Sequence, residues 1–165
     1  MLSTSSEDFA RIRQWRQSYI GVNPAHEFDF EWLEVIRDDA SYHFGFYQDQ
    51  VLAGGVRFTP VGHGLTLSER LVNIPELFNQ HCSLLDVNRL LVHEDLRGSM
   101  VAINALKYCR QWMHDHTIHE GFIALCVPRF VNLYKRVGAR LVAEDISVTN
   151  LPSKRYSLMS FMYKE

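Results

Sequence analysis

The segment between residues 84 and 138 limits the possible folds of this chain more than any other part of it. Its hydrophobic pattern indicates a strand, a turn that contains glycine, a long helix, a second strand and a short helix, in that order. The expected elements are a strand at Leu84–Val92, a turn at Glu94–Gly98, a helix at Ser99–His114, a strand at Gly121–Val127 and a helix at Phe130–Val137. Gly138 follows the last helix and suits a left-handed C-terminal cap.

The remaining segments predict further strands and helices on both sides of this unit. Helices are expected at Glu7–Tyr19 and Phe30–Arg37, and strands at His43–Tyr47, Gln50–Thr59, Arg140–Glu144 and Arg155–Tyr163. The first two of these strands are joined at Gln48-Asp49 and should form a hairpin. The element order is α-α-β-β, then β-α-β-α, then β-β, which predicts a mixed α/β sandwich around one sheet. No linker divides the chain, so residues 1–165 are expected to form a single domain.

Composition and charge exclude several classes of protein. Apolar residues make up 47% of the sequence and charged residues 22%, which is typical of a globular protein. A formal net charge of −2 gives no basic surface of the kind that nucleic acid needs. The N-terminal sequence lacks a signal peptide and no apolar run approaches the length of a membrane span, so a cytoplasmic location is expected.

The cysteine and histidine residues do not form the pattern of a metal site. The three cysteines are Cys82, Cys109 and Cys126. They are odd in number and far apart, so we expect reduced thiols and neither a disulfide framework nor a zinc pair. His114, His116 and His119 lie at a helix end and in the loop after it, and no cysteine or carboxylate set completes a tetrahedral site. We therefore predict no metal ion.

The turn before the long helix is a candidate binding site for a phosphate group. A helix N-terminus presents free backbone N–H groups and the positive end of the helix dipole, and both favour an anion. Arg97-Gly98-Ser99 stands at this point. A single glycine before a helix can equally mark a tight turn and nothing more, so the neighbouring residues decide between the two interpretations.

Two motifs around this turn resemble the signatures of the Gcn5-related N-acetyltransferase (GNAT) superfamily. Val92–Ala102 (VHEDLRGSMVA) is similar to its acyl-CoA loop, Arg/Gln-x-x-Gly-x-Gly/Ala, and Asn132–Gly138 (NLYKRVG) is similar to its second signature. The resemblance implies the GNAT fold, with a central, mostly antiparallel sheet and helices on both faces. It also implies an acyl-thioester co-substrate. The residues that would bind this co-substrate are Leu91, Val92, Arg97, Gly98, Ser99, Ala102 and Asn132.

One position departs from the superfamily pattern. Met100 stands where these proteins usually carry glycine, and a long side chain there would crowd a diphosphate that lies against the backbone. The phosphopantetheine of an acyl carrier protein has one phosphate where coenzyme A has a diphosphate. A carrier-protein donor would therefore be less affected than acyl-CoA, and both donors are considered.

The first half of the chain is similar to the acyl-homoserine-lactone synthases and related N-acyl amino acid synthases. The segments that carry this similarity are Val51–Pro60 (VLAGGVRFTP), Leu65–Leu67, Pro75–Phe78 and Asp86–Arg89 (DVNR). The resemblance implies that Arg57 and Arg89 bind the substrate and that Asp86 is the carboxylate of the central strand. It also implies that Asp29 and Glu27 are acidic residues on the substrate side.

Acyl transfer to an amine explains why such residues would be needed. An amine is nucleophilic only when it is neutral, so Asp86, or Asp29 through a water molecule, would remove its proton. A backbone N–H on a bulged central strand would stabilise the oxyanion that forms on the thioester. Tyr134 is the candidate acid for the leaving thiolate.

Each of these assignments has a structural alternative. Asp86 and Arg89 could form a buried ion pair, and Tyr134 could be a packing residue. Arg57 could be a solvated residue on a strand edge, and Asp29 could belong to a turn or a helix cap.

The sequence therefore predicts an enzyme, an N-acyltransferase that uses an acyl-carrier-protein or acyl-CoA thioester and a small amine such as an amino acid or its derivative. The expected partners are this amine and an acyl carrier protein, with no nucleic acid and no membrane. Two alternatives stay open. One is an acetyl-CoA-dependent acetyltransferase of small molecules or peptides, and the other is a non-catalytic regulatory module that binds a thioester.

Overall fold

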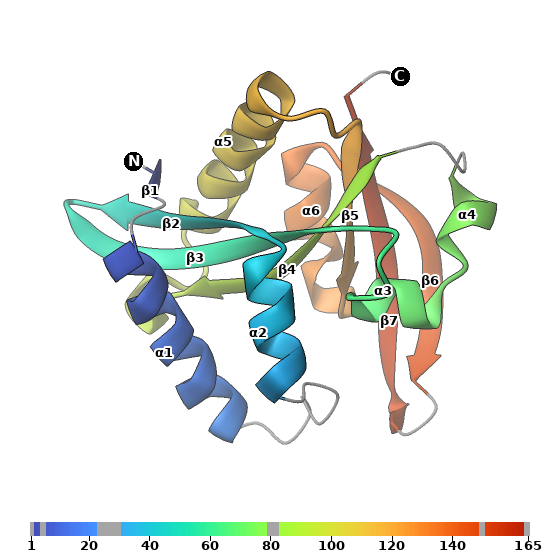
Figure 1. The fold of residues 1–165 in the computed structure, drawn as a ribbon, viewed down its shortest axis with the longest axis horizontal. Helices are drawn as coiled ribbons and strands as arrows, with labels where there is room; N and C mark the ends of the chain where they lie inside the picture. Colours follow the sequence, from blue (N-terminus) through green and yellow to red (C-terminus); the bar gives the residue numbers. More distant parts are fainter. Residues whose placement is uncertain (1, 4–5, 23–30, 79–82, 149–150, 164–165) are drawn as a thin grey trace.

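The computed structural model describes residues 2–3, 6–22, 31–78, 83–148 and 151–163, and Figure 1 shows their arrangement. The helices and strands, in chain order, are β1 (Leu2–Ser3), α1 (Ser6–Val22), α2 (Glu31–Asp39), β2 (Tyr42–Gln48), β3 (Val51–Pro60), α3 (Leu67–Leu71), α4 (Ile74–Leu77), β4 (Leu84–Val92), α5 (Val101–His116), β5 (Gly121–Cys126), α6 (Val131–Val137), β6 (Arg140–Val148) and β7 (Leu151–Met162). Short 3-10 turns precede α5 at Glu94–Leu96 and α6 at Pro128–Phe130. Every helix and strand expected from the sequence is confirmed, with small shifts at most boundaries.

Strand β1 and the short helices α3 and α4 are additions that the hydrophobic pattern did not predict. Helix α3 begins with a capping box, in which Thr66 Oγ1 accepts from the Glu69 backbone N–H and Glu69 accepts from the Thr66 backbone N–H. The same carboxylate accepts from the backbone N–H groups of Gly62 at 2.6 Å and Gly64 at 3.0 Å. Glu69 thus fixes the loop after β3 against the start of α3.

One sheet of seven strands, in the order β1-β2-β3-β4-β5-β7-β6, forms the centre of the fold. All neighbouring strands are antiparallel except β4 and β5, so the sheet is mostly antiparallel, as expected. Strands β4 and β5 pair only from Leu84 to Asp86 and from Gly121 to Ile123. Beyond these residues the two strands diverge, and the sheet is split along its middle (Figure 1).

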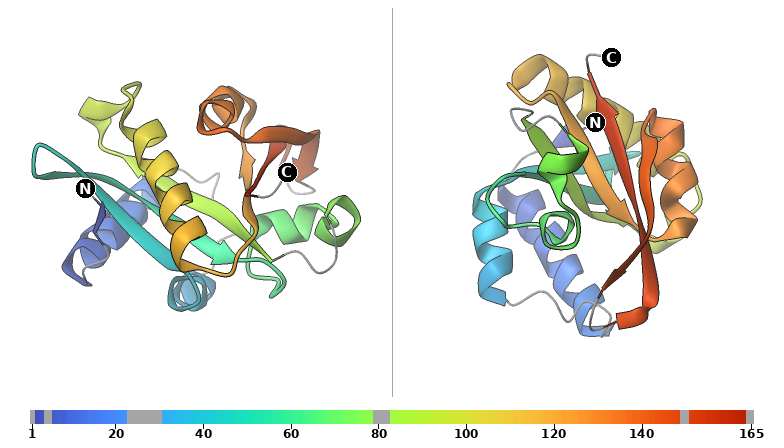
Figure 2. Two further views of the ribbon diagram at one scale, coloured as in Figure 1. Left: turned by 90° about the horizontal axis from the view of Figure 1, so that it is seen from above. Right: turned by 90° about the vertical axis from the view of Figure 1, so that its right-hand side faces the viewer.

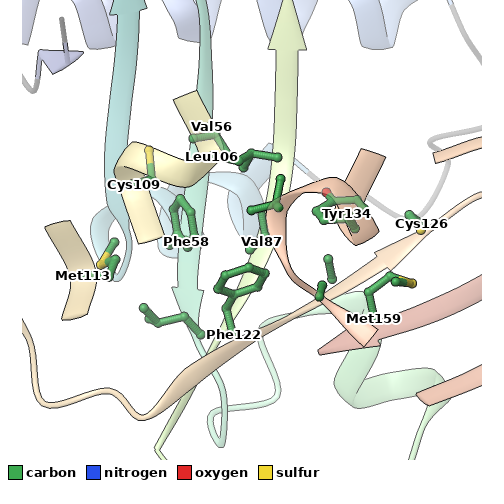
Figure 3. Packing of buried hydrophobic residues seen from close by; sticks show 14 of the residues in the cluster. Val56, Phe58, Val87, Leu106, Cys109, Met113, Phe122, Cys126, Tyr134 and Met159 are labelled. Carbon is green, nitrogen blue, oxygen red and sulfur yellow. The ribbon is translucent and has the colours of Figure 1, made fainter. Parts of the chain in front are cut away.

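The main hydrophobic core lies between the sheet and helices α5 and α6. These two helices cover one face, whereas α1 and α2 lie on the other (Figure 2). Core side chains come from both sides of the split, among them Phe58 and Val87 on one side and Phe122 and Met159 on the other (Figure 3). The rings of Phe58 and Phe122 meet edge to face with centroids 6.2 Å apart. No helix in the described part of the chain has the length and apolar character needed to cross a membrane.

The opposite face of β2, β3 and β4 is polar. Side chains alternate along a strand, so the residues next to the core residues point to this second face. His43, Arg57 and Asn88 are in register across the three strands, and Thr59 is in register with Asp86. Helices α1 and α2 pack on this face, so its buried polar groups need partners inside the protein.

Candidate active site

Two acidic residues of α2 face the polar side of the sheet. Glu34 and Asp38 are four residues apart and project from the same side of the helix. Together they hold the guanidinium of Arg57, which is 2% exposed in the middle of β3. Arg57 Nη1 donates to Asp38 Oδ1 at 2.8 Å and to Glu34 Oε2 at 3.1 Å, and Nη2 donates to Glu34 Oε1 at 3.0 Å. Arg57 Nε donates to Asn88 Oδ1 at 2.6 Å, so Arg57 is a buried network residue and not a solvated edge residue.

A bulge in β4 brings Arg89 to the same carboxylate. Between the residue pairs that flank the bulge, β3 has the single residue Val56 and β4 has two, Arg89 and Leu90. Arg89 Nη2 donates to Glu34 Oε1 at 3.0 Å, and Arg89 Nε lies 3.3 Å and 3.4 Å from the two carboxylate oxygens. Burial alone would raise the pKa of Glu34, but the two arginines outweigh it and lower that pKa to about 2. Glu34 is therefore an anion at every pH near neutrality.

Further arginines reach the same two carboxylates. Arg16 Nη1 donates to Asp38 Oδ1 at 3.0 Å, Arg37 Nη1 lies 3.5 Å from Glu34 Oε1, and Arg13 Nε lies 3.8 Å from Asp38 Oδ2. Among the described residues, the arginines are Arg13, Arg16, Arg37, Arg57 and Arg89, and the carboxylates are Glu34 and Asp38. Each of these arginines contacts Glu34 or Asp38, and Arg37 and Arg89 make further interactions besides.

The guanidinium of Arg16 is only partly hydrogen-bonded to the described residues. Its side chain is 3% exposed, yet its Nε and Nη2 atoms have no partner among the described residues. Burial lowers the pKa of Arg16 to about 10, against the attraction of Asp38, and the nearby Arg57 lowers it further. A buried guanidinium with unfilled donors can receive an anionic group such as a carboxylate.

Asp86 lies on the polar face of β4, at the last residue pair that β4 shares with β5. It is 3% exposed, and the hydroxyl groups of Ser68 and Thr66 approach it from the start of α3. Burial raises the pKa of Asp86 to about 6, although the two hydroxyl groups act in the opposite direction. The alternative of an ion pair with Arg89 is not what the described contacts show, because Arg89 pairs with Glu34. A carboxyl group with this pKa is mostly ionised at neutral pH and can accept a proton.

Tyr134 of α6 lies on the core side of the split between β4 and β5. It packs in one cluster with Val87 of β4 and Cys126 of β5 (Figure 3). Burial raises the pKa of Tyr134 above its ordinary value, and Cys126 and Asp86 add to this. Its hydroxyl makes no hydrogen bond to another described residue. Tyr134 is therefore protonated at neutral pH and keeps a hydrogen to donate.

The turn between β4 and α5 has the geometry expected of an anion cradle. Gly98 adopts φ +83°, which favours glycine, and α5 starts three residues later. The backbone N–H groups of Met100, Ala102 and Ile103 donate to no residue in the described part of the chain. Arg97, Gly98 and Ser99 are exposed beside them. These donors are available to a phosphate oxygen.

Met100 and α6 meet at the edge of this cradle. The Met100 side chain is 44% exposed, and its Sδ atom accepts from Arg136 Nη2 at 2.8 Å. Met100 and Arg136 belong to the two sequence motifs, so these motifs are in contact although the two residues lie 36 apart in the chain. Asn132 lies exposed on α6, and Leu91 and Val92 lie half-buried at the end of β4. Their roles in binding a donor stay predictions.

The structure brings most of the predicted residues around the split in the sheet. Arg57, Arg89 and Asp86 lie on its polar face, Tyr134 lies on its core side, and the cradle follows β4 directly. Two predicted residues, Asp29 and Glu27, lie outside the described residues. The catalytic and binding roles themselves stay predictions.

Sequence reasoning missed the carboxylates that organise this site. Glu34 and Asp38 had a usable signal, since two acids four residues apart on a short helix can face one buried arginine. Arg16 had none, because its burial depends on how α1 packs against α2.

The fold is similar to that of several solved structures. FeeM, an N-acyl amino acid synthase from uncultured soil microbes, superposes with a TM-score of 0.74 at 10% identity, covering 100% of this chain and 90% of that chain. NAA60 from Arabidopsis thaliana, in complex with acetyl-CoA, gives 0.65 at 15% identity and covers 100% of both chains. The spermidine N-acetyltransferase SpeG from Vibrio cholerae gives 0.54 at 12% identity, covering 78% and 69%.

The split, mostly antiparallel sheet and these likenesses define the fold, which is the GNAT fold. Among curated protein sequences, none matches the chain. The family model described as N-acyl amino acid synthase FeeM matches residues 10–161, and the chain belongs to this family. It is therefore an enzyme, an N-acyltransferase.

Proposed function

We propose that this enzyme transfers an acyl group from a phosphopantetheine thioester to the amino group of an amino acid. The observation that carries the proposal is Arg16, a buried arginine beside Asp38 whose Nε and Nη2 atoms have no partner among the described residues. A plain amine would add positive charge to this region and be repelled. An amino acid brings a carboxylate that the arginines can bind, and charge-assisted hydrogen bonds of this kind are strong.

The proposed acyl transfer uses residues on both faces of the split sheet. Asp86, or Asp29 through a water molecule, takes the proton from the ammonium group, and the neutral nitrogen attacks the thioester carbonyl carbon. A backbone N–H at the bulge stabilises the oxyanion. The C–S bond then breaks as Tyr134 donates its proton to the sulfur, and the nitrogen gives up its second proton, which restores the Tyr134 phenol. The products are an amide and a free thiol, and Glu27 and Asp29 are assigned to the acceptor by the sequence resemblance alone.

The donor is proposed to be an acyl carrier protein, with acyl-CoA as the weaker substrate. Met100 occupies the position where a diphosphate would lie against the backbone, and Arg136 holds it there. Exposed cations at the cradle, Arg97 and Arg136, suit an acidic carrier protein.

An acyl-transfer assay with matched acceptors tests the proposal. Acyl-carrier-protein and acyl-CoA of several chain lengths are mixed with an amino acid, with its amide, and with the amine that lacks the carboxyl group. Free thiol and the N-acyl product are measured. We expect the amino acid to react at least about tenfold faster than the other two acceptors. Absence of product with every donor would overturn the proposal, and equal rates for the three acceptors would overturn carboxylate recognition.

A pair of variants separates binding by Arg16 from a general effect of charge. Arg16→Gln should raise KM for the amino acid and leave KM for the carboxyl-free amine unchanged. Arg11→Gln removes an exposed arginine of the same helix and should change neither. Equal effects of the two substitutions would contradict a carboxylate site at Arg16.

A second candidate function is acetyl transfer from acetyl-CoA. The free backbone N–H groups at the start of α5 favour it, because they suit the diphosphate of coenzyme A. Calorimetry with acetyl-CoA decides between the two, since tight binding despite Met100 would favour acetyl-CoA and its absence would favour a carrier protein.

A further inference from the structure

The bulge in β4 requires a backbone conformation that its residue does not favour. Arg89 has φ +54°, and a residue with a β-carbon adopts this left-handed region only at a cost. An ordinary strand conformation at Arg89 would be easier to adopt, and it would remove the bulge. Something in the fold must therefore hold Arg89 where it is.

The contacts of Glu34 identify what holds it. One carboxylate oxygen, Oε1, accepts from Arg89 Nη2 at 3.0 Å and from Arg57 Nη2 at 3.0 Å. Arg57 stands on β3 in register with Asn88, the residue just before the bulge, and Arg57 Nε donates to Asn88 Oδ1 at 2.6 Å. Glu34 thus connects the bulge residue to the neighbouring strand at the place where the register changes.

We propose that Glu34 is a positioning residue that acts through Arg89 to hold the β4 bulge open, so that the bulge backbone can donate to the thioester carbonyl oxygen. This inference rests on the proposed function. Glu34 itself does not exchange protons with substrate, because its pKa of about 2 keeps it charged. Arg89 accordingly acts on the backbone of its own strand and not only on a bound substrate.

Two substitutions of Arg89 distinguish positioning from substrate binding. Arg89→Gly and Arg89→Ala both remove the guanidinium, so a pure binding role predicts equal losses of kcat/KM. Glycine adopts a positive φ freely, whereas alanine disfavours it by roughly tenfold or more in population. If Arg89 holds the bulge, Arg89→Gly should keep at least about tenfold more kcat than Arg89→Ala, with similar KM for the acyl donor.

A double-mutant cycle then tests the role of Glu34. Glu34→Gln should lower kcat by about a hundredfold in the natural protein, as expected when an oxyanion donor is misplaced. The same substitution should have a much smaller effect on kcat in the Arg89→Gly background, where the bulge no longer depends on the ion pair. Asp39→Asn, on the same helix at an exposed position, is the control and should leave kcat unchanged.

A measurement that does not require enzyme activity makes the test independent of the proposed function. The Cα and Cβ chemical shifts of residue 89 in labelled protein report a positive φ. They should indicate it in the natural protein and lose it in Glu34→Gln, while circular dichroism checks that the fold persists. If no thioester reacts with the natural protein, the proposed function fails and the shifts still decide the inference. Equal kcat for Arg89→Gly and Arg89→Ala, or unchanged shifts in Glu34→Gln, would overturn it.

Discussion

Replacing Asp86 by asparagine would show whether the candidate base is held at a cost to stability. The substitution keeps the size of the side chain and removes its charge. Burial raises the pKa of Asp86 from 3.8 to about 6 in the folded protein. A group whose pKa is higher in the folded state favours folding while it is protonated, so its contribution is complete below about pH 4 and is lost as the pH rises through 6.

The magnitude follows from the size of the shift. A rise of about two pKa units, at about 1.36 kcal/mol per unit, corresponds to about 3 kcal/mol. The free energy of unfolding of Asp86→Asn, minus that of the natural protein, should therefore increase by about 3 kcal/mol between about pH 4 and pH 8. For a chain of this size that equals a relative gain in Tm of roughly 6–12 °C.

Urea unfolding followed by tryptophan fluorescence, at several pH values across this range, measures the difference. The asparagine amide can also change the free energy of unfolding by an amount that does not depend on pH. This amount cancels, because the test uses only how the difference between the two proteins varies with pH. Asp39→Asn removes an exposed carboxylate and should give a flat difference. A flat difference for Asp86→Asn as well would refute the raised pKa and with it the argument that this carboxyl is suited to accept a proton.

Three other substitutions test separate parts of the structure. Tyr134→Phe should lower kcat by about 10²–10⁴ with little loss of stability, since its hydroxyl bonds to no described residue, and stopped-flow release of thiol measures this. Met100→Gly should lower KM for acyl-CoA and leave KM for the carrier-protein donor nearly unchanged, which steady-state kinetics can compare. Gly138→Ala should lower the free energy of unfolding by about 1–2 kcal/mol without changing kcat, because Gly138 has φ +99° at the end of α6, and thermal unfolding checks it.

The long elements of the fold could be predicted because each buries a periodic face. Strand β4 matches its expected bounds, and Gly138 caps α6 as expected. Helices α3 and α4 are too short to show a helical period, and only the capping pair of Thr66 and Glu69 marks the first of them. Strand β6 is longer than predicted because its register shifts interrupt the alternation of side chains.

Some residues of the candidate site could likewise be predicted from the sequence, and others could not. Residues that belong to local motifs, such as Arg97 and Tyr134, were identifiable from the resemblance of those motifs to the superfamily signatures. The partners of Arg89 were not, because Glu34 lies 55 residues earlier and meets it only after α2 packs on the sheet. A polar residue in an apolar strand indicates that a hydrogen-bond or ion-pair partner is needed. Which residue is the partner depends on tertiary packing.

The short pairing of β4 with β5 has a consequence for how the enzyme unfolds. Only three residue pairs join the two parts of the sheet through their backbones, yet Phe58, Val87, Phe122 and Met159 form one apolar cluster across the divide. Cooperativity between the two parts therefore depends on side-chain packing more than on the hydrogen-bond ladder. The two parts of the sheet are therefore expected to unfold as one unit even though few backbone hydrogen bonds join them.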